Sequence, residues 1–279
     1  MTAIAVPAAR SPARPGSLRA NLRLFWLGGL ISYRALFNWA RPSIFIPTLI
    51  GAPTFQILFF AAFGSYATGR DPAYFAIGNS VQVSAMAGIY GMTMAIANER
   101  WFGTLHALLA TPASRWAIFG GRFIPFIVNG LLVSVYGFAI SVIFLGVRLD
   151  PSTIGVAALA LLACVFSCSA IGAFQGSLSL RLRDGLFGAN LLVFALLLFS
   201  GVNVPLEALP GWMQAVSQVL PFTHGLQAVR MAADGAGLDA VGHLILLEVL
   251  IGCVFAILAF GLFSYLETSA RRNATLDVR

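Results

Sequence analysis

The chain has 279 residues, 59% hydrophobic and only 10% charged, with a formal net charge of +7. Soluble domains carry about 25% charged residues, so the composition excludes a soluble enzyme and predicts an all-α membrane protein with several spans. The basic residues are all arginines that border the apolar runs, where membrane orientation explains them better than binding to nucleic acid. We therefore expect no nucleic-acid partner.

The N-terminal region precedes the first long apolar run. Residues 1–16 are rich in Pro, Ala and Arg, which predicts a disordered cytoplasmic tail, and the first spanning run begins only near Ile44, so we expect no signal peptide. Residues 17–41 place Leu22, Trp26 and Leu30 on one side and are interrupted by arginines. This pattern predicts an amphipathic helix in the lipid headgroups. The alternative is an extension of the first span.

Six apolar segments are each long enough to cross about 30 Å of hydrocarbon. They cover residues 44–64, 74–97, 116–144, 155–180, 186–204 and 242–265. We predict one membrane domain over residues 42–268, a cytoplasmic tail over 269–279, and bends at Pro47 and Pro53 in the first span.

The arginines predict the orientation of these spans. If the N-terminus is inside, only Arg70, Arg148 and Arg230 of the 17 basic residues lie outside. The positive-inside rule therefore places both termini in the cytoplasm.

Two connecting segments stand out. Between the second and third spans, Glu99 and Arg100 open a short amphipathic helix over residues 100–111, which ends at Thr111-Pro112 because proline disfavours a helical residue before it. Between the fifth and sixth spans, prolines divide residues 205–230 into short pieces with an apolar face, which predicts re-entrant extracytoplasmic helices.

These two segments, in this order, resemble the signature of type-2 ATP-binding-cassette exporter permeases, and most closely the daunorubicin-resistance-like drug exporters. The first match comprises Glu99-Arg100, Gly103-Thr104-Leu105, Leu108-Leu109, Thr111-Pro112, Arg115 and Gly121-Arg122; the second comprises Ser200-Gly201, Pro205-Leu206-Glu207, Leu209-Pro210-Gly211-Trp212, Pro221 and Arg230. Trp101-Phe102 and His106 depart from the family pattern, where acidic residues are more common.

The resemblance implies a subunit of the bacterial plasma membrane that pairs with an identical or paralogous permease, contacts membrane lipids and docks two ATPase subunits. The helix over 17–41 and the helix after the second span would receive the ATPase movement. The implied coupling residues are Glu99, Arg100, Gly103, Thr104, Leu105, Leu108, Thr111 and Pro112, and the implied extracytoplasmic gate residues are Pro205, Leu206, Pro210, Trp212 and Pro221.

The residues needed for ATP hydrolysis are missing from this chain. A phosphate-binding loop needs a lysine, and the sequence contains none, so ATP and Mg would bind the partner ATPase. We find no nucleophile with a nearby base, and His106, His224 and His243 lack metal-ligand spacing. We expect a transport subunit with no catalytic residues, metal or cofactor of its own.

A substrate path needs polar side chains on a shared interior face. In the second span such residues recur at steps of three and four, and the fifth span offers others. The candidates are Asn79, Gln82, Met86, Tyr90 and Thr93, with Asn190, Phe194, Phe199 and Asn203. The alternative for each residue is helix–helix packing through hydrogen bonds.

Glu248 is the one carboxylate well inside a predicted span, and such an acid is a functional candidate. The alternative is a structural role, in which it pairs with Arg230 or reaches water.

Together these features predict an ATP-driven exporter of amphiphilic drug-like or lipid-like compounds. One alternative is a polysaccharide or glycolipid exporter of the same superfamily. A proton-coupled secondary transporter would need several buried acids or histidines and an inverted repeat, and a membrane scaffold or immunity protein would not transport anything.

Overall fold

The computed structural model describes residues 18–37, 50–101, 103, 115–181 and 185–273, and all regular structure in these ranges is helical. The helices are α1 (Leu18–Phe37), α3 (Ala52–Thr68), α4 (Pro72–Trp101), α6 (Arg115–Leu145), α7 (Ile154–Ser179), α8 (Gly185–Phe199), the 3-10 turn η2 (Leu206–Ala208), α9 (Gly211–Val219), α10 (Thr223–Ala233) and α11 (Leu238–Asn273).

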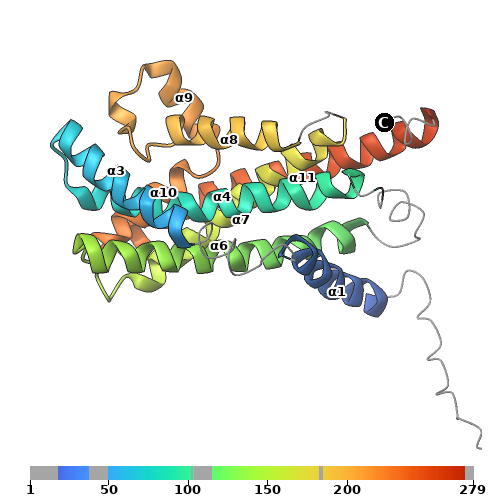
Figure 1. The fold of residues 1–279 in the computed structure, drawn as a ribbon, viewed down its shortest axis with the longest axis horizontal. Coiled ribbons are helices and arrows are strands. Elements are labelled where there is room, and N and C mark those ends of the chain that lie inside the picture. The colour runs from blue at the N-terminus through green and yellow to red at the C-terminus, as the bar shows by residue number, and fades with distance from the viewer. Residues whose placement is uncertain (1–17, 38–49, 102, 104–114, 182–184, 274–279) are drawn as a thin grey trace, which may run out of the picture.

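The long helices form an elongated bundle whose members alternate in direction (Figure 1). Helix α7 lies at its centre and packs against α4 and α11, while α4 also packs against α6, α3 and α8. Helix α1 packs on α6, near the end of the bundle that also holds the last turns of α4 and α11. The α9 helix lies toward the opposite end.

Four helices in the described ranges are long and apolar enough to cross a membrane: Pro72–Glu99, Gly120–Leu145, Ile154–Ser179 and Leu238–Leu266. These match the second, third, fourth and sixth predicted spans and make the chain a multi-pass membrane protein. The α8 helix is apolar but has only 15 residues, and the helical part of α3 has 17.

The first and fifth predicted spans have different bounds from those expected. Pro53 lies in the first turn of α3, where its missing N–H is tolerated, and residues 50–51 before it form a π-helical turn, so the bend at Pro53 stays a prediction. Residues 44–49, including Pro47, lie outside the described residues. The α8 helix ends at Phe199 and not at 204, because Gly201 adopts a left-handed φ of 80° and turns the chain toward η2.

Glycines bring α4 and α7 into direct backbone contact. A Cβ on Gly172 would lie 2.7 Å from the carbonyl oxygen of Ile89, and one on Gly176 would lie 3.1 Å from the backbone of Thr93. Small residues at such crossings let the helices approach closely. This contact fixes the position of α4 along the axis of α7, and with it the positions of the polar side chains of α4.

Candidate functional site

The polar side chains of α4 bond to α8 and to the loop that follows it. The Asn79 Nδ2 group donates to Asn203 Oδ1 at 2.9 Å, and the Tyr90 hydroxyl donates to Asn190 Oδ1 at 2.6 Å. Asn79 is fully buried. Buried amides and hydroxyls are costly unless they are bonded, so these contacts fix which face of α4 meets α8.

The α3 helix contributes a polar residue that the sequence analysis did not single out. The Gln56 Nε2 group lies 3.3 Å from both Asn79 Oδ1 and Gln82 Oε1. These side chains, with Asn203, form an uncharged cluster that joins α3, α4 and the α8–η2 loop. A glutamine inside an otherwise apolar run was the signal that could have identified it.

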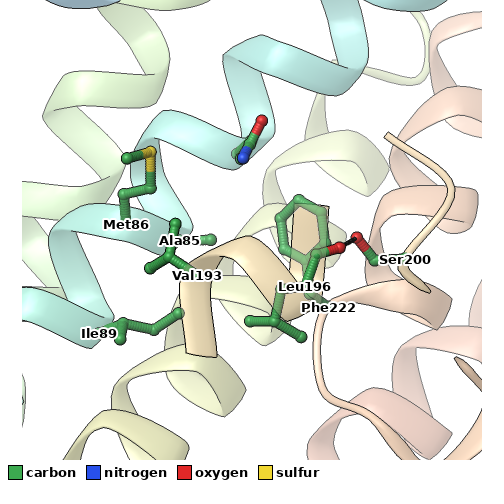
Figure 2. Close-up of a pocket in the computed structure, with 8 residues that line it drawn as sticks. Ala85, Met86, Ile89, Val193, Leu196, Ser200 and Phe222 are labelled. Carbon is green, nitrogen blue, oxygen red and sulfur yellow. Dashed lines mark hydrogen bonds between the residues drawn. The ribbon is translucent and has the colours of Figure 1, made fainter. Parts of the chain in front are cut away.

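A small cavity lies between α4 and α8, next to this polar cluster. Figure 2 shows Ala85, Met86 and Ile89 of α4 near Val193 and Leu196 of α8, with the ring of Phe222 beside Leu196 and Ser200. Gln82 completes the lining. The empty volume is about 210 Å³ including its open mouth, which is below the roughly 300–1,000 Å³ of drug-sized sites. The cavity is therefore too small for a drug-sized molecule in this conformation.

Other candidate path residues lie elsewhere. The Thr93 hydroxyl donates to the Gly172 carbonyl at 3.0 Å, so it faces α7 and not α8. Phe194 is 65% exposed on this single chain. The Phe199 ring packs edge-on against Trp212, at 6.1 Å between centroids.

The segment between α8 and α11 is built from η2, α9 and α10. Of the candidate gate residues, Pro205 and Pro221 are buried, Leu206 is partly buried, and Pro210 and Trp212 are exposed. The α10 helix is largely buried and packs against α7, α11 and α4. This segment is thus part of the bundle and not a free loop.

Arg230 of α10 holds the α8–η2 loop against the start of α4. Its guanidinium donates to the carbonyls of Gly201 and Val202, both at 2.9 Å, and to that of Tyr74 at 3.2 Å. It also lies 3.6 Å above the Tyr74 ring, a cation–π contact. Burial lowers the pKa of Arg230 to about 10, so the group stays charged at neutral pH.

Glu248 does not pair with Arg230 or reach water, contrary to the structural alternative. It is fully buried on α11 and binds the turn that begins α10. Its Oε1 accepts hydrogen bonds from the Ser167 hydroxyl and, at 2.5 Å, from the Phe222 N–H, while Oε2 accepts one from the Gly225 N–H at 2.9 Å. Sequence spacing gave no signal for these contacts, because two of the partners are backbone N–H groups and the third is a serine of another helix.

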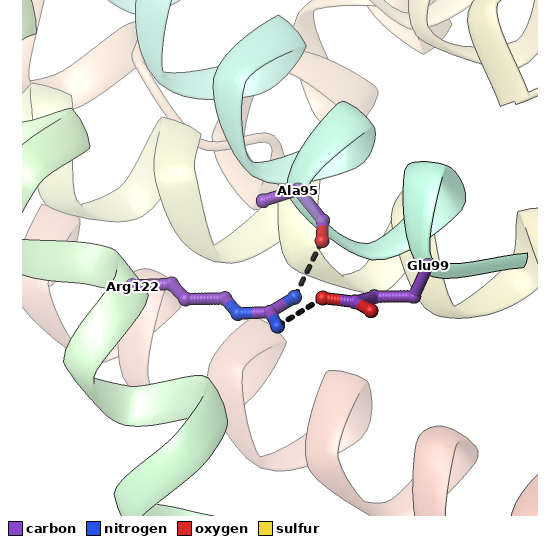
Figure 3. Close-up of polar contacts among 3 residues, drawn as sticks. All are labelled: Ala95, Glu99 and Arg122. Atoms are coloured by element: carbon purple, nitrogen blue, oxygen red, sulfur yellow. Dashed lines mark hydrogen bonds and ion pairs between the residues drawn. The ribbon is translucent and has the colours of Figure 1, made fainter. Parts of the chain in front are cut away.

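At the other end of the bundle, Glu99 pairs with Arg122 of α6. One guanidinium nitrogen lies 2.5 Å from the carboxylate, and the other donates to the Ala95 carbonyl at 2.5 Å (Figure 3). Gly103 is exposed with a left-handed φ of 68°. The side chain of Arg100 and all of Thr104, Leu105, Leu108, Thr111 and Pro112 lie outside the described residues, so the predicted coupling helix stays a prediction.

Within the described ranges, no group of three His, Cys, Asp or Glu side chains is placed to hold a metal ion. The groups between α4 and α8 are amides, hydroxyls, the Met86 thioether and aromatic rings. The Glu99–Arg122 ion pair lies at one end of the bundle, and the partly buried Arg230 lies at the other.

Comparison with known proteins identifies the family. Residues 29–233 match the model of the ABC-2 type transporter family. The chain belongs to the ABC-2 type transporter family. The match runs from α1 through α10 and thus includes the polar cluster, the cavity and Arg230.

Curated relatives of this ABC-2 chain are permease subunits. The chain is 28% identical to the daunorubicin resistance ABC transporter permease protein DrrB1 of Streptomyces coeruleorubidus, over 92% of this chain and 90% of that protein. It is 28% identical to the probable doxorubicin resistance ABC transporter permease protein DrrC of Mycobacterium tuberculosis, over 81% and 83% of the two chains. It is 24% identical to the probable multidrug ABC transporter permease YbhR of Escherichia coli, over 57% of this chain and 43% of that protein.

Proposed function

We propose that this ABC-2 chain is the permease subunit of an ATP-driven exporter that moves amphiphilic, drug-like compounds out of the cell. The observation that carries the proposal is the similarity along most of the chain to permeases named for daunorubicin and doxorubicin resistance. In this proposal ATP and Mg bind separate ATPase subunits, and the chain itself hydrolyses nothing.

The chemistry between α4 and α8 supports such a substrate. The cavity and its neighbours offer amide groups, a phenol and a thioether, and they carry no charged side chain among Asn79, Gln82, Met86, Tyr90 and Asn190. Such a surface suits a large apolar molecule with a few hydrogen-bonding groups. Transport would require α4 and α8 to separate, because the cavity is too small for such a molecule in this conformation.

The proposed topology has six spans in the bacterial plasma membrane, with α3 and α8 completing the four long ones and both termini in the cytoplasm. The first and last proposed spans, α3 and α11, run in opposite directions (Figure 1), which supports an even number of crossings, and the arginine distribution supports the orientation. In this arrangement α1 lies in the inner headgroups, and η2, α9 and α10 form the re-entrant extracytoplasmic element. A reporter fused after Arg279 that reads as extracytoplasmic would contradict this orientation.

Two ATPase subunits and a second permease, identical or paralogous, complete the proposed complex. The proposed contacts for the ATPase are α1 and the segment from Glu99 to Pro112, at one end of the bundle. Copurification tests this directly: the tagged chain, extracted in mild detergent from its native host, should retain an ABC ATPase. A preparation that transports daunorubicin with a proton gradient and without ATP would refute the proposal.

A further inference from the structure

The α10 helix begins without a cap from its own segment. Phe222 occupies the N-cap position and has no side-chain oxygen to accept the free N–H groups of the first turn. Phe222 also has a left-handed φ of 87°, the one positive φ among the non-glycine residues that the structure describes. A bulky residue in this region is strained by about 1–3 kcal/mol and persists only where its surroundings hold it.

Glu248 supplies the missing cap from another helix. Its two carboxylate oxygens accept the N–H groups of Phe222 and Gly225, and the Ser167 hydroxyl of α7 donates a third bond. The two backbone N–H groups are fixed donors, whereas the Ser167 hydroxyl, which also lies 3.0 Å from the Cys164 carbonyl oxygen, can either donate to the Glu248 carboxyl group or accept from it. The Glu248 carboxyl group thus lies at the positive end of the α10 dipole, where carboxyl oxygens are favoured.

Gly225 makes the contact possible. A Cβ at this position would lie 2.2 Å from the Cys164 sulfur and 3.1 Å from Glu248 Cγ. The first turn of α10 therefore lies with its backbone directly against α7 and α11. The carboxylate reaches both N–H groups only because no side chain separates them.

The ring of Phe222 connects this cap to the cavity. Phe222 is 1% exposed and lines the cavity with Met86 of α4 and Leu196 of α8 (Figure 2). Its position depends on the strained backbone that Glu248 holds through the Phe222 N–H. Phe222 therefore contacts Glu248 of α11 through its backbone and the α4–α8 cavity through its ring.

We propose that Glu248 is a positioning residue that caps α10 from α11 and thereby holds the Phe222 ring across the α4–α8 cavity. The ring closes the end of the path next to Ser200 and the α8–η2 loop. The consequence for transport rests on the proposed function, whereas the capping role does not.

Hydrogen exchange on the full chain in lipid nanodiscs tests the capping role without any partner. In the wild-type chain, the amides of Phe222 and Gly225 should exchange as slowly as those in the middle of α7. Glu248→Gln keeps the size of the side chain but replaces one acceptor oxygen by an NH₂ donor. Exchange at the two amides should then rise about tenfold, the typical effect of losing an N-terminal helix cap.

The control is Ser177→Ala, which removes a buried hydroxyl that bonds Ala259 between the same two helices, α7 and α11. It should leave exchange at Phe222 and Gly225 unchanged. If Glu248→Gln does not fold, Ser167→Ala serves in its place and should raise exchange a few-fold, since two of the three bonds to Glu248 remain. Fast exchange of both amides in the wild-type chain, or unchanged exchange in Glu248→Gln, would overturn the inference.

Transport provides the second readout. In the complex with its ATPase, Glu248→Gln and Phe222→Ala should each change the ATP-dependent daunorubicin flux by about the same factor, and the double variant should change it no further, because both act through one ring. Additive effects would contradict the link through Phe222. A wild-type complex that moves no daunorubicin would count against the proposed function but would leave the exchange result standing.

Discussion

At the scale of single residues, the polar side chains that the structure describes bond to backbone carbonyls and amides more often than to other side chains. Arg230 and Glu248 were expected as possible partners of each other, and each has instead a set of backbone partners. Sequence spacing cannot reveal such partners, because every residue carries the same N–H and C=O groups. It did reveal that these residues needed a partner, since a charge in a membrane protein is costly without one.

Arg230→Lys tests the contact between α10 and the α8–η2 loop. A lysine ammonium cannot donate to three carbonyls in the planar geometry of a guanidinium, so we expect a loss of about 1–3 kcal/mol in stability. Thermal unfolding in detergent micelles measures it. Tyr74→Phe is the matched control: it keeps the ring under the guanidinium and removes the Tyr74 hydroxyl, with its 3.0 Å bond to Gly201 and its interaction with Arg230. It should cost less than Arg230→Lys, and the opposite order would contradict this account.

Glu99→Gln tests the buried pair at the other end. Arg122 is 4% exposed, and losing its carboxylate partner should lower the thermal stability by about 1–3 kcal/mol. Glu99→Gln combined with Arg122→Met should recover part of that loss, because no buried charge is then left without its counterion. If the double variant loses more stability than Glu99→Gln and Arg122→Met lose together, the ion pair is not the main partner of Arg122, and its other contacts hold it.

At the scale of elements, the apolar runs predicted α4, α6, α7 and the apolar part of α11 to within a few residues, because length and hydropathy are local properties; the polar end of α11, up to Asn273, lies beyond the predicted span. The ends of α3 and α8 were predicted less well. They depend on Pro53 and on the left-handed turn at Gly201, and that turn is held by Arg230, which lies far along the sequence. The rotation of each helix about its axis was also not predictable, which is why Gln56 was missed; Thr93, a candidate for the path, bonds to Gly172 of α7, as its packing alternative allowed.

The contact between α1 and α6 gives a test at this scale. A Cβ on Gly121 of α6 would lie 2.0 Å from the Phe25 carbonyl oxygen of α1. A Cβ on Gly29 of α1 would lie 2.2 Å from the Gly121 carbonyl oxygen. Gly29→Ala should therefore separate the two helices and cost about 1–3 kcal/mol. Gly28→Ala, one residue away on the same helix, has no atom within 4 Å of the new Cβ and should not destabilise the chain. Equal unfolding temperatures for the two variants would show that α1 does not pack on α6 through these glycines.

At the scale of the whole molecule, the two ends of the bundle are built from different helices and different charged residues. One end holds α1, the Glu99–Arg122 pair and the last turn of α4; the other holds α9 and Arg230 with the loop that it binds. The cavity lies between these two ends, where α4 meets α8, and the polar cluster lies next to it. This division matches a subunit that is moved at one end and opens at the other, which is the proposed exporter.

The central claim is that a separate ATPase drives this chain through the segment after α4. The direct measurement is ATP-dependent uptake of daunorubicin into inside-out proteoliposomes that contain the chain and its copurified ATPase, with and without Leu105→Glu and Leu108→Glu. We predict uptake that requires ATP for the wild-type chain, and loss of both uptake and ATPase binding for the variant. Uptake and binding that both survive the two substitutions would contradict the claim.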